Sequence, residues 1–334
     1  MIEVTHHDRI AIMRMASGKA NAISLEFCEL LSSRFEELAA SSAHAIVITG
    51  TGKIFSAGVD LVRLLDGGPA YIRRFLPALC SMFLSVFSCP KPVVAAINGH
   101  AIAGGCVLAC AADRRLMAQD GGRIGVTELL VGVPFPSIAM EIMRCATAPR
   151  YFSDVILSAA TYAPAEAMGR GLIDDAVDAG VLLDRAVERA RALAALPPAA
   201  FAMTKRAIRQ AALERAELDA SRADIEQIWT APDTLNRIRD YVAPTLGEES
   251  CLRAAYIPRL GRLAAAPRTP VLGRGAWRQR QKWRRMRWLV AIPPQGRHHD
   301  ESCDHRRDRS NRHSPRGRAA QDGCRGARSR PRDG

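Results

Sequence analysis

The sequence predicts an α/β fold in its first part, followed by a mostly helical region. Three short apolar segments, at residues 10–15, 45–49 and 93–97, are typical of buried strands. Segments with helical spacing of apolar residues lie between them, and helical patterns dominate from about residue 137 onward. At 334 residues the chain is also long enough to bury a large core. We therefore expect an α/β part over roughly 1–135 and a helical part that ends near residue 250.

The first helix is predicted over 25–40, because Ser24 is a favoured N-cap residue and the apolar side chains that follow recur at helical spacing. After the strand at 45–49, the Gly67-Gly68-Pro69 segment predicts a loop, and residues 71–87 predict an amphipathic helix. Pro90 and Pro92 then favour an extended entry into the strand at 93–97.

A helix is predicted to begin at Gly104 and to end before Asp113, followed by a strand at 115–118. Pro164 at the first helical position and Gly171 after the last one predict a helix over 164–170. A short strand is expected at 173–177. The remaining predicted helices span 138–145, 151–157, 181–196, 200–218, 221–230 and 233–242.

Charge divides the chain unevenly. Of 47 Lys and Arg and 34 Asp and Glu, residues 251–334 hold 22 and 6, which leaves +16 in this tail and −3 in the first 250 residues. The tail has no apolar periodicity that would fold, so we expect it to be disordered. Its Arg, Pro and Gly bias is what a shifted reading frame in a GC-rich gene would produce. An Arg-rich arm with interleaved Trp is the alternative, and it would bind nucleic acid or an anionic membrane.

Nine cysteines form no CxxC pair and have no histidine spacing typical of zinc, which predicts free thiols in a reducing compartment and no metal site. The first residues lack the basic and apolar regions of a signal sequence. Apolar runs are interrupted well short of the ~20 residues that a membrane span needs. These observations predict a soluble, cytoplasmic protein without a membrane span.

Two bends rich in small residues are the most informative feature of the sequence. Residues 98–107 follow a strand and begin an apolar helix, which leaves backbone N–H groups free where little side-chain bulk covers them. Residues 55–61 form a second such bend after the strand at 45–49. Two converging N–H donors are the arrangement that stabilises an oxyanion, as thioester chemistry requires.

Across about residues 1–245 the chain resembles the enoyl-CoA hydratase/isomerase (crotonase) family. The resemblance rests on several motifs in the family's order, and no single motif would carry it. These motifs are IVITG at 46–50, FSAGVDL at 55–61, KPVVAAINGHA at 91–101, AGGC at 103–106 leading to Asp113, GVTE at 125–128 with Gly132 and Pro134, and YAPAEA at 162–167 with GLI at 171–173.

The resemblance implies a spiral of ββα turns with a helical C-terminal region that packs subunits into trimers, often stacked as hexamers. We therefore expect an acyl-CoA-binding core over 1–195, a helical C-terminal region over 196–250 and the Arg-rich tail over 251–334. The implied partner is an acyl-CoA substrate, and nucleic acid enters only as a possible partner of the tail.

For the site, the resemblance implies that the N–H groups of Val59 and Gly104 are the oxyanion donors and that Glu128 moves the proton. Gly105 and Ala103 would let the thioester approach closely. The alternative for these small residues is close packing of a helix on a strand. Apolar neighbours at 126 and 129–131 predict a desolvated Glu128 with a raised pKa; an ordinary surface glutamate is the alternative.

Hydratases of the family carry a second glutamate two residues after the second Gly of the motif, and Val107 occupies that position here. Valine can neither hold nor protonate a water. With one acid–base group, transfer of a proton from C2 to C4 of a 3-enoyl thioester stays feasible, which favours an isomerase. The alternatives are a hydratase in which another residue assists Glu128, and a non-catalytic binder of acyl-CoA or nucleic acid.

Coenzyme A is expected only as part of the substrate, since the Gly-rich segments lack the spacing of a dinucleotide site. The resemblance places Ser56, Ala57, Asp60, Leu61 and Gly105 near it. Other residues have weaker claims, each with a structural alternative. Lys205 and Arg206 could bind the 3′-phosphate or simply be solvated. Glu141, Asp60 and Asp66 could reach the pocket, or they could form ion pairs and helix caps. His100, Cys106 and Cys110 could take part in chemistry, but we expect them to belong to the core.

Overall fold

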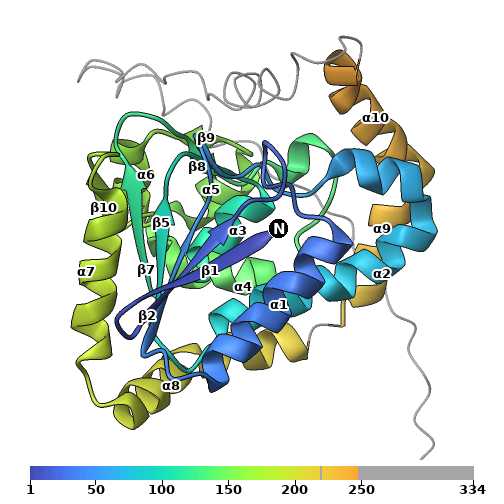
Figure 1. The fold of residues 1–334 in the computed structure, drawn as a ribbon. Helices are drawn as coiled ribbons and strands as arrows, with labels where there is room; N and C mark the ends of the chain where they lie inside the picture. The colour runs from blue at the N-terminus through green and yellow to red at the C-terminus, as the bar shows by residue number, and fades with distance from the viewer. Residues whose placement is uncertain (219, 247–334) are drawn as a thin grey trace, which may run out of the picture. The chain divides into compact units, whose positions relative to one another are not determined.

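The computed structural model describes residues 1–218 and 220–246; the tail predicted over 251–334 lies outside the described residues. Within them the chain is a mixed α/β fold with helices in its C-terminal region, as predicted (Figure 1). The strands are β1 (Ile2–His7), β2 (Ile10–Met15), β3 (Ala45–Thr49), β4 (Ile54–Ser56), β5 (Val93–Ile97), β6 (His100–Ile102), β7 (Arg114–Ala118), β8 (Ile124–Gly125), β9 (Thr161–Tyr162) and β10 (Asp175–Val177). The helices are α1 (Leu25–Ala40), α2 (Leu61–Phe87), α3 (Gly104–Cys110), α4 (Ser137–Ala146), α5 (Phe152–Leu157), α6 (Pro164–Arg170), α7 (Leu182–Ala194), α8 (Pro198–Glu217), α9 (Arg222–Thr230) and α10 (Pro232–Leu246), with 3₁₀ turns η1 (Glu128–Leu130) and η2 (Pro149–Tyr151).

Two sheets organise the described chain. The larger has the order β1-β2-β3-β5-β7-β10, in which only the β1–β2 pair is antiparallel. The smaller has the order β4-β6-β8-β9. Strands β4 and β6 each follow one strand of the large sheet, so the chain leaves β3 and β5 to enter the small sheet and then returns through a helix. Each of the two small-residue bends therefore includes residues of a small-sheet strand, β4 in the first and β6 in the second.

The large sheet is covered on both faces, because its strands alternate between two apolar clusters. In β2, Ile10 and Ile12 point to the face covered by α7, where they meet Leu182 and Ala186. Met13 lies in the other cluster, together with buried side chains of α1, α2 and α3 (Figure 1). The nearly uninterrupted apolar runs of β3 and β5 are explained by this double burial.

Helix α1 has the predicted bounds, and the Ser24 hydroxyl accepts a hydrogen bond from the Phe27 N–H as its N-cap. Helix α2 corrects a prediction, because it begins at Leu61 and continues through the segment expected to be a loop. The Gly67–Pro69 segment interrupts it at one residue only: Gly68 has φ 56° and ψ −157°. Pro69 then restarts the helix in a first turn, where a missing N–H costs nothing.

Among the described residues, α2 is also the one helix long and apolar enough to cross a membrane. Its apolar face is instead part of the protein core, with Leu64, Ile72, Phe75 and Phe83 almost completely buried. This packing identifies α2 as a core helix.

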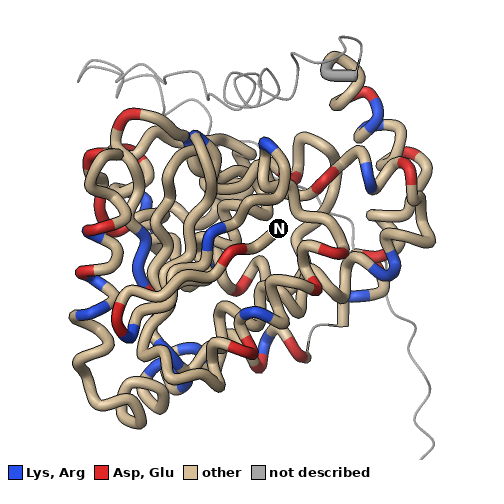
Figure 2. The backbone as a smooth tube through the Cα atoms, viewed as in Figure 1, with Lys and Arg blue, Asp and Glu red and all other residues tan. Residues whose placement is uncertain are grey.

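Acidic and basic residues are interspersed along the backbone of the described residues (Figure 2). The strong positive charge of the sequence thus belongs to the tail. The boundary expected near residue 195, between a core and a helical C-terminal region, stays a prediction.

Candidate active site

The bend at 55–61 is fixed by hydrogen bonds from within the chain. The Ser56 hydroxyl donates to the Asn21 carbonyl at 2.8 Å and accepts from the Gly58 N–H at 3.1 Å. Gly58 has φ 85°, in the left-handed region that favours glycine. This geometry turns the chain sharply and presents the next residue, Val59, at the surface of a pocket.

Val59 is paired with Ile23 in an isolated parallel bridge. The Ile23 N–H donates to the Gly58 carbonyl, and the Asp60 N–H donates to the Ile23 carbonyl. Because both bonds to Ile23 come from the neighbours of Val59, the N–H of Val59 itself faces away from Ile23. Within the described residues it has no acceptor, so it is available to a ligand.

The second bend leaves a donor free in the same way. Ala103 has φ 52° and its carbonyl accepts from the N–H groups of Cys106 and Val107, which begins helix α3. The Gly104 N–H, at the first position of this helix, has no acceptor in the described part of the chain. Gly104 lines the same pocket as Val59.

The two bends are in direct contact. A β-carbon built on Gly58 would lie 3.2 Å from the Gly104 nitrogen, and one built on Gly104 would lie 3.7 Å from Val59 Cγ2. A β-carbon on Gly105 would lie 2.4 Å from the Ser56 carbonyl oxygen. The Gly-Gly pair therefore serves close packing of α3 on the 55–61 bend, and this packing brings the Gly104 N–H beside Val59.

Glu128 lies at the start of η1 and is 9% exposed. Its Oε2 is buried and has no hydrogen-bond partner among the described residues. Burial raises the pKa of the carboxyl to about 7, against hydrogen bonds from the backbone of Glu128 and Thr127 that lower it. The predicted desolvation and raised pKa are confirmed. Leu129, which was predicted as one of its apolar neighbours, is instead 42% exposed.

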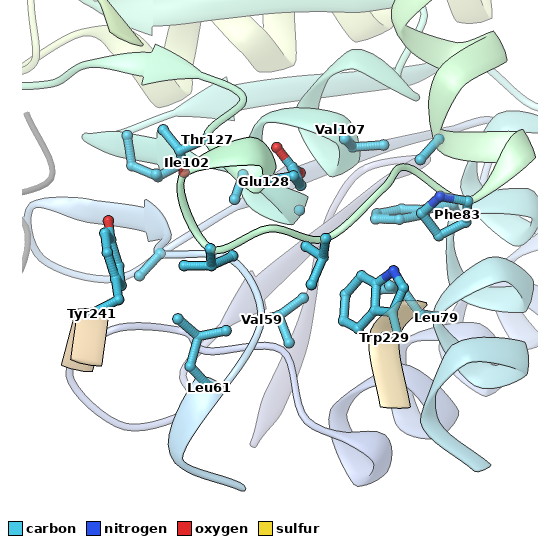
Figure 3. Close-up of a pocket in the computed structure, with 17 residues that line it drawn as sticks. Val59, Leu61, Leu79, Phe83, Ile102, Val107, Thr127, Glu128, Trp229 and Tyr241 are labelled. Carbon is cyan, nitrogen blue, oxygen red and sulfur yellow. The ribbon is translucent and has the colours of Figure 1, made fainter. Parts of the chain in front are cut away.

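The pocket contains about 600 Å³ of space outside protein atoms, part of it open to solvent. Figure 3 shows Glu128 and Val107 on one side of this space and Val59 and Leu61 on the other. Among the described residues that line the pocket, Glu128 is the one that carries a carboxylate. The lining residues are Ala57, Val59, Leu61, Leu79, Phe83, Ile102, Ala103, Gly104, Val107, Thr127, Glu128, Val131, Val133, Pro136, Ala139, Trp229 and Tyr241.

Of the five residues predicted near coenzyme A, two line the pocket and three do not. Ser56 is fully buried and is not among the lining residues. Gly105 is also buried and lies outside the lining. The carboxylate of Asp60 caps α2 by accepting from the Arg63 N–H at 3.1 Å. Ala57 and Leu61 do line the pocket.

Lys205 corrects another prediction, since it is buried rather than solvated. It is 7% exposed and donates to Asp113 Oδ2 at 2.7 Å and to the Lys91 carbonyl at 3.0 Å. Arg209 donates to the other oxygen of Asp113 at 2.8 Å. Arg206 is exposed. The buried cluster of Asp113, Lys205 and Arg209 links α8 to the start of strand β5, where the Val93 N–H donates to Asp113.

Glu141 is buried outside the pocket and pairs with Arg144 and Arg215, as the ion-pair alternative predicted. Asp66 is exposed. His100 is half-buried and its Nδ1 accepts from the Arg123 N–H at 3.3 Å, while burial lowers its pKa. Cys106 and Cys110 are buried in the core.

Trp229 and Tyr241 were not predicted as site residues. They come from α9 and α10 and reach the pocket from opposite ends (Figure 3). The two helices were predicted from their apolar spacing. Helical spacing does not show which of their side chains reach a pocket whose other lining residues lie between positions 57 and 139. The described residues contain no group of three His, Cys, Asp or Glu side chains that would hold a metal ion.

Comparison with known proteins supports the family resemblance found in the sequence. The profile of the enoyl-CoA hydratase/isomerase family matches residues 5–237. A Thermus thermophilus protein assigned as an enoyl-CoA hydratase is 32% identical over 191 residues, which cover 56% of this chain and 75% of that protein. Human mitochondrial enoyl-CoA delta isomerase 1 is 28% identical over 209 residues, 62% of this chain and 69% of the human protein.

Solved structures show the same fold. The enoyl-CoA isomerase of Mycobacterium tuberculosis has a TM-score of 0.61 and 33% identity, and the alignment covers 68% of this chain and 96% of that one. The enoyl-CoA hydratase EchA3 of Mycobacterium ulcerans has a TM-score of 0.62 and 32% identity over 68% and 97% of the two chains. The family profile and the shared fold together show that this chain belongs to the enoyl-CoA hydratase/isomerase family.

Proposed function

We propose that the protein is an enoyl-CoA isomerase that converts 3-enoyl thioesters of coenzyme A into 2-enoyl thioesters in fatty acid metabolism. The observation that supports this proposal best is Glu128, the one carboxylate that the described residues contribute to an apolar pocket with two free backbone donors. Coenzyme A enters as part of the substrate and no further cofactor is needed.

The N–H groups of Val59 and Gly104 bind the thioester carbonyl oxygen. As a proton leaves C2, negative charge develops on this oxygen, and two fixed donors stabilise it without having to reorient. Losing one donor of this kind typically costs about 10²–10³ in rate. The contact between the two bends supports their action on one atom.

Glu128 moves the proton. Its ionised carboxylate takes the proton from C2, which gives a dienolate and a neutral carboxyl group. The same carboxyl then returns that proton to C4, so that the double bond moves from C3–C4 to C2–C3 and Glu128 is ionised again. A pKa of about 7 suits both steps, because the group accepts and releases a proton near neutral pH.

Val107 supports an isomerase over a hydratase. It lines the pocket beside Glu128 and is 1% exposed, so an apolar surface stands where a second acid would hold a water. The hydratase remains the second candidate, favoured by relatives that carry that name and by the hydroxyl-bearing Thr127 and Tyr241 on the pocket wall.

A direct assay separates the two candidates. Purified protein is incubated with a 3-enoyl-CoA and, separately, with crotonyl-CoA, and the products are identified by mass. We expect migration of the double bond without added mass. Rapid hydration of crotonyl-CoA, with the mass of one water gained, would favour the hydratase. Binding of both thioesters without any turnover would indicate the non-catalytic binder.

We further propose a homotrimer, or a hexamer of two trimers, in the cytoplasm. On helix α8, Met203 and Ile208 are 75% and 74% exposed to solvent. Apolar side chains exposed to this extent are typical of a surface that is covered in an assembly. The described cysteines are all free thiols, which suits a reducing compartment. Light scattering of the whole chain and of a chain ending at residue 250 tests the assembly; salt-sensitive RNA binding by the whole chain alone would assign that activity to the tail.

A further inference from the structure

The pocket has an open end and a closed end. Ala57, Leu61 and Tyr241 are half-buried, so solvent reaches this side and a large coenzyme has room to leave the protein. At the other end, Leu79, Phe83 and Trp229 are at most 2% exposed. In Figure 3, Trp229 lies with Leu79 and Phe83 on the side of the pocket away from Tyr241.

Trp229 is held in place from two directions. Its indole N–H donates to the Pro134 carbonyl at 2.9 Å, which ties α9 to the segment that follows Glu128. The indole also packs against Phe75 of α2, with ring centroids 6.5 Å apart and an interplanar angle of 46°. An indole fixed by a hydrogen bond and by ring packing cannot swing aside without losing both interactions.

We infer that Trp229 closes the acyl end of the pocket and restricts the substrate to acyl thioesters of at most about eight carbons, which excludes long-chain ones. This inference rests on the proposed function and adds the class of acyl group. An acyl chain that enters past Val59 and Glu128 lies against apolar walls, and each buried methylene raises affinity about fourfold. Close-packed interiors do not yield to extra atoms, so the gain ends where the chain meets the indole.

Saturated acyl-CoA thioesters are the appropriate probe, because they bind without reacting. Their affinities, measured by calorimetry from acetyl-CoA to dodecanoyl-CoA, give a curve that rises with chain length and then breaks. For the wild type we expect the break at or before octanoyl-CoA. An affinity that keeps rising through dodecanoyl-CoA would overturn the inference.

Two substitutions at buried lining positions should move the break in opposite directions. Trp229→Ala removes the indole, and the break should move to chains at least two carbons longer. Ala139→Leu adds bulk at another buried lining position, on α4, and the break should move to shorter chains. Large-to-small core changes are destabilising, so if Trp229→Ala fails to fold, Ala139→Leu decides the question.

Two further variants serve as controls. Trp229→Phe loses the hydrogen bond to Pro134 but keeps most of the ring, so its break should stay within one carbon of the wild type. Leu61→Ala changes the open end and should weaken all chain lengths by a similar factor. An unmoved break in both Trp229→Ala and Ala139→Leu would refute the inference even if isomerase activity is found. A moved break without isomerase activity would instead refute only the proposed reaction.

Discussion

Gly58 and Gly104, 46 positions apart, lie so close that a β-carbon on Gly58 would come within 3.2 Å of the Gly104 nitrogen. The same β-carbon would lie 2.7 Å from the Ile102 carbonyl oxygen, and Gly58 has φ 85°. The 55–61 bend and the start of α3 thus fit together only because no side chain stands between them. The two backbone donors owe their proximity to this fit.

Gly58→Ala should push the two bends apart and lower kcat about 10²–10³-fold, the usual cost of a lost oxyanion donor. Gly52→Ala is the matched control, since Gly52 also has positive φ, 61°, but a β-carbon there meets nothing within 4 Å. Both variants carry the cost of about 1–2 kcal/mol for a left-handed alanine, which thermal unfolding measures. Equal kcat losses in both variants would contradict the proposed role of the bend.

Glu128→Gln should lower kcat on 3-enoyl thioesters by about 10²–10⁴-fold while product binding changes little, because glutamine fills the same space but cannot accept the proton. Glu141→Gln provides the comparison: this buried glutamate lies outside the pocket and pairs with Arg144 and Arg215. Steady-state kinetics should show kcat within a few-fold of the wild type for Glu141→Gln. Full turnover by Glu128→Gln would remove Glu128 from the mechanism.

The pH dependence follows from the raised pKa of Glu128. The free enzyme must hold an ionised carboxylate to take the proton from C2, so kcat/KM should rise with pH and level off above about pH 7. A profile between pH 5 and 9 locates the midpoint. A profile that is already level at pH 5, as an ordinary carboxyl pKa of 4.5 would give, would show that the carboxyl is solvated in the active enzyme.

Stability should change with pH in the opposite direction. Burial raises the pKa of Glu128 in the folded state from 4.5 to about 7, so the folded protein binds this proton more tightly than the unfolded chain. The contribution is fully present below pH 4.5 and is lost as pH rises toward 7. Relative to Glu128→Gln, the wild type should therefore lose on the order of 3 kcal/mol of unfolding free energy over this range. Urea denaturation of both proteins at several pH values measures the difference; parallel curves would argue against the burial.

Asp113 supports the fold without touching the pocket. Its two oxygens accept from Lys205 and Arg209, and all three side chains are at most 14% exposed. Asp113→Asn should cost about 3–5 kcal/mol, because it leaves two buried cations without their carboxylate. Glu37→Gln, which removes an exposed pair with Arg34, should cost at most about 1 kcal/mol. Chemical denaturation compares them, and similar losses would show that the buried cluster is not strongly coupled.

Local patterns were predictable where local chemistry determines them. The bounds of α1 follow from the Ser24 cap and its apolar spacing, and the α6 end at Gly171 follows from a left-handed C-cap with φ 83°. The loop predicted at 67–69 was wrong because one glycine with unusual backbone angles and a proline at a tolerated position bend a helix without ending it. A Gly-Gly-Pro sequence occurs both in turns and in kinked helices, so composition does not distinguish the two.

The partners of buried charges were harder to predict. Lys205 appears in sequence as an ordinary helix-surface lysine, and only the folded chain brings it to Asp113, 92 positions away. Trp229 was likewise part of a predicted helix but not of a predicted pocket. A helix pattern identifies an apolar face without saying what that face meets.

The sequence by itself determined the family, the two small-residue bends, the candidate proton carrier Glu128 and the apolar residue at position 107, because these depend on residue type at fixed local spacing. Only the tertiary structure decided that the bends touch, that the Glu128 carboxylate is buried without a partner, and that Trp229 closes the pocket. Burial and contact depend on segments that are far apart in the sequence and come together only in the folded chain. The free energy of such contacts therefore cannot be predicted from either segment alone.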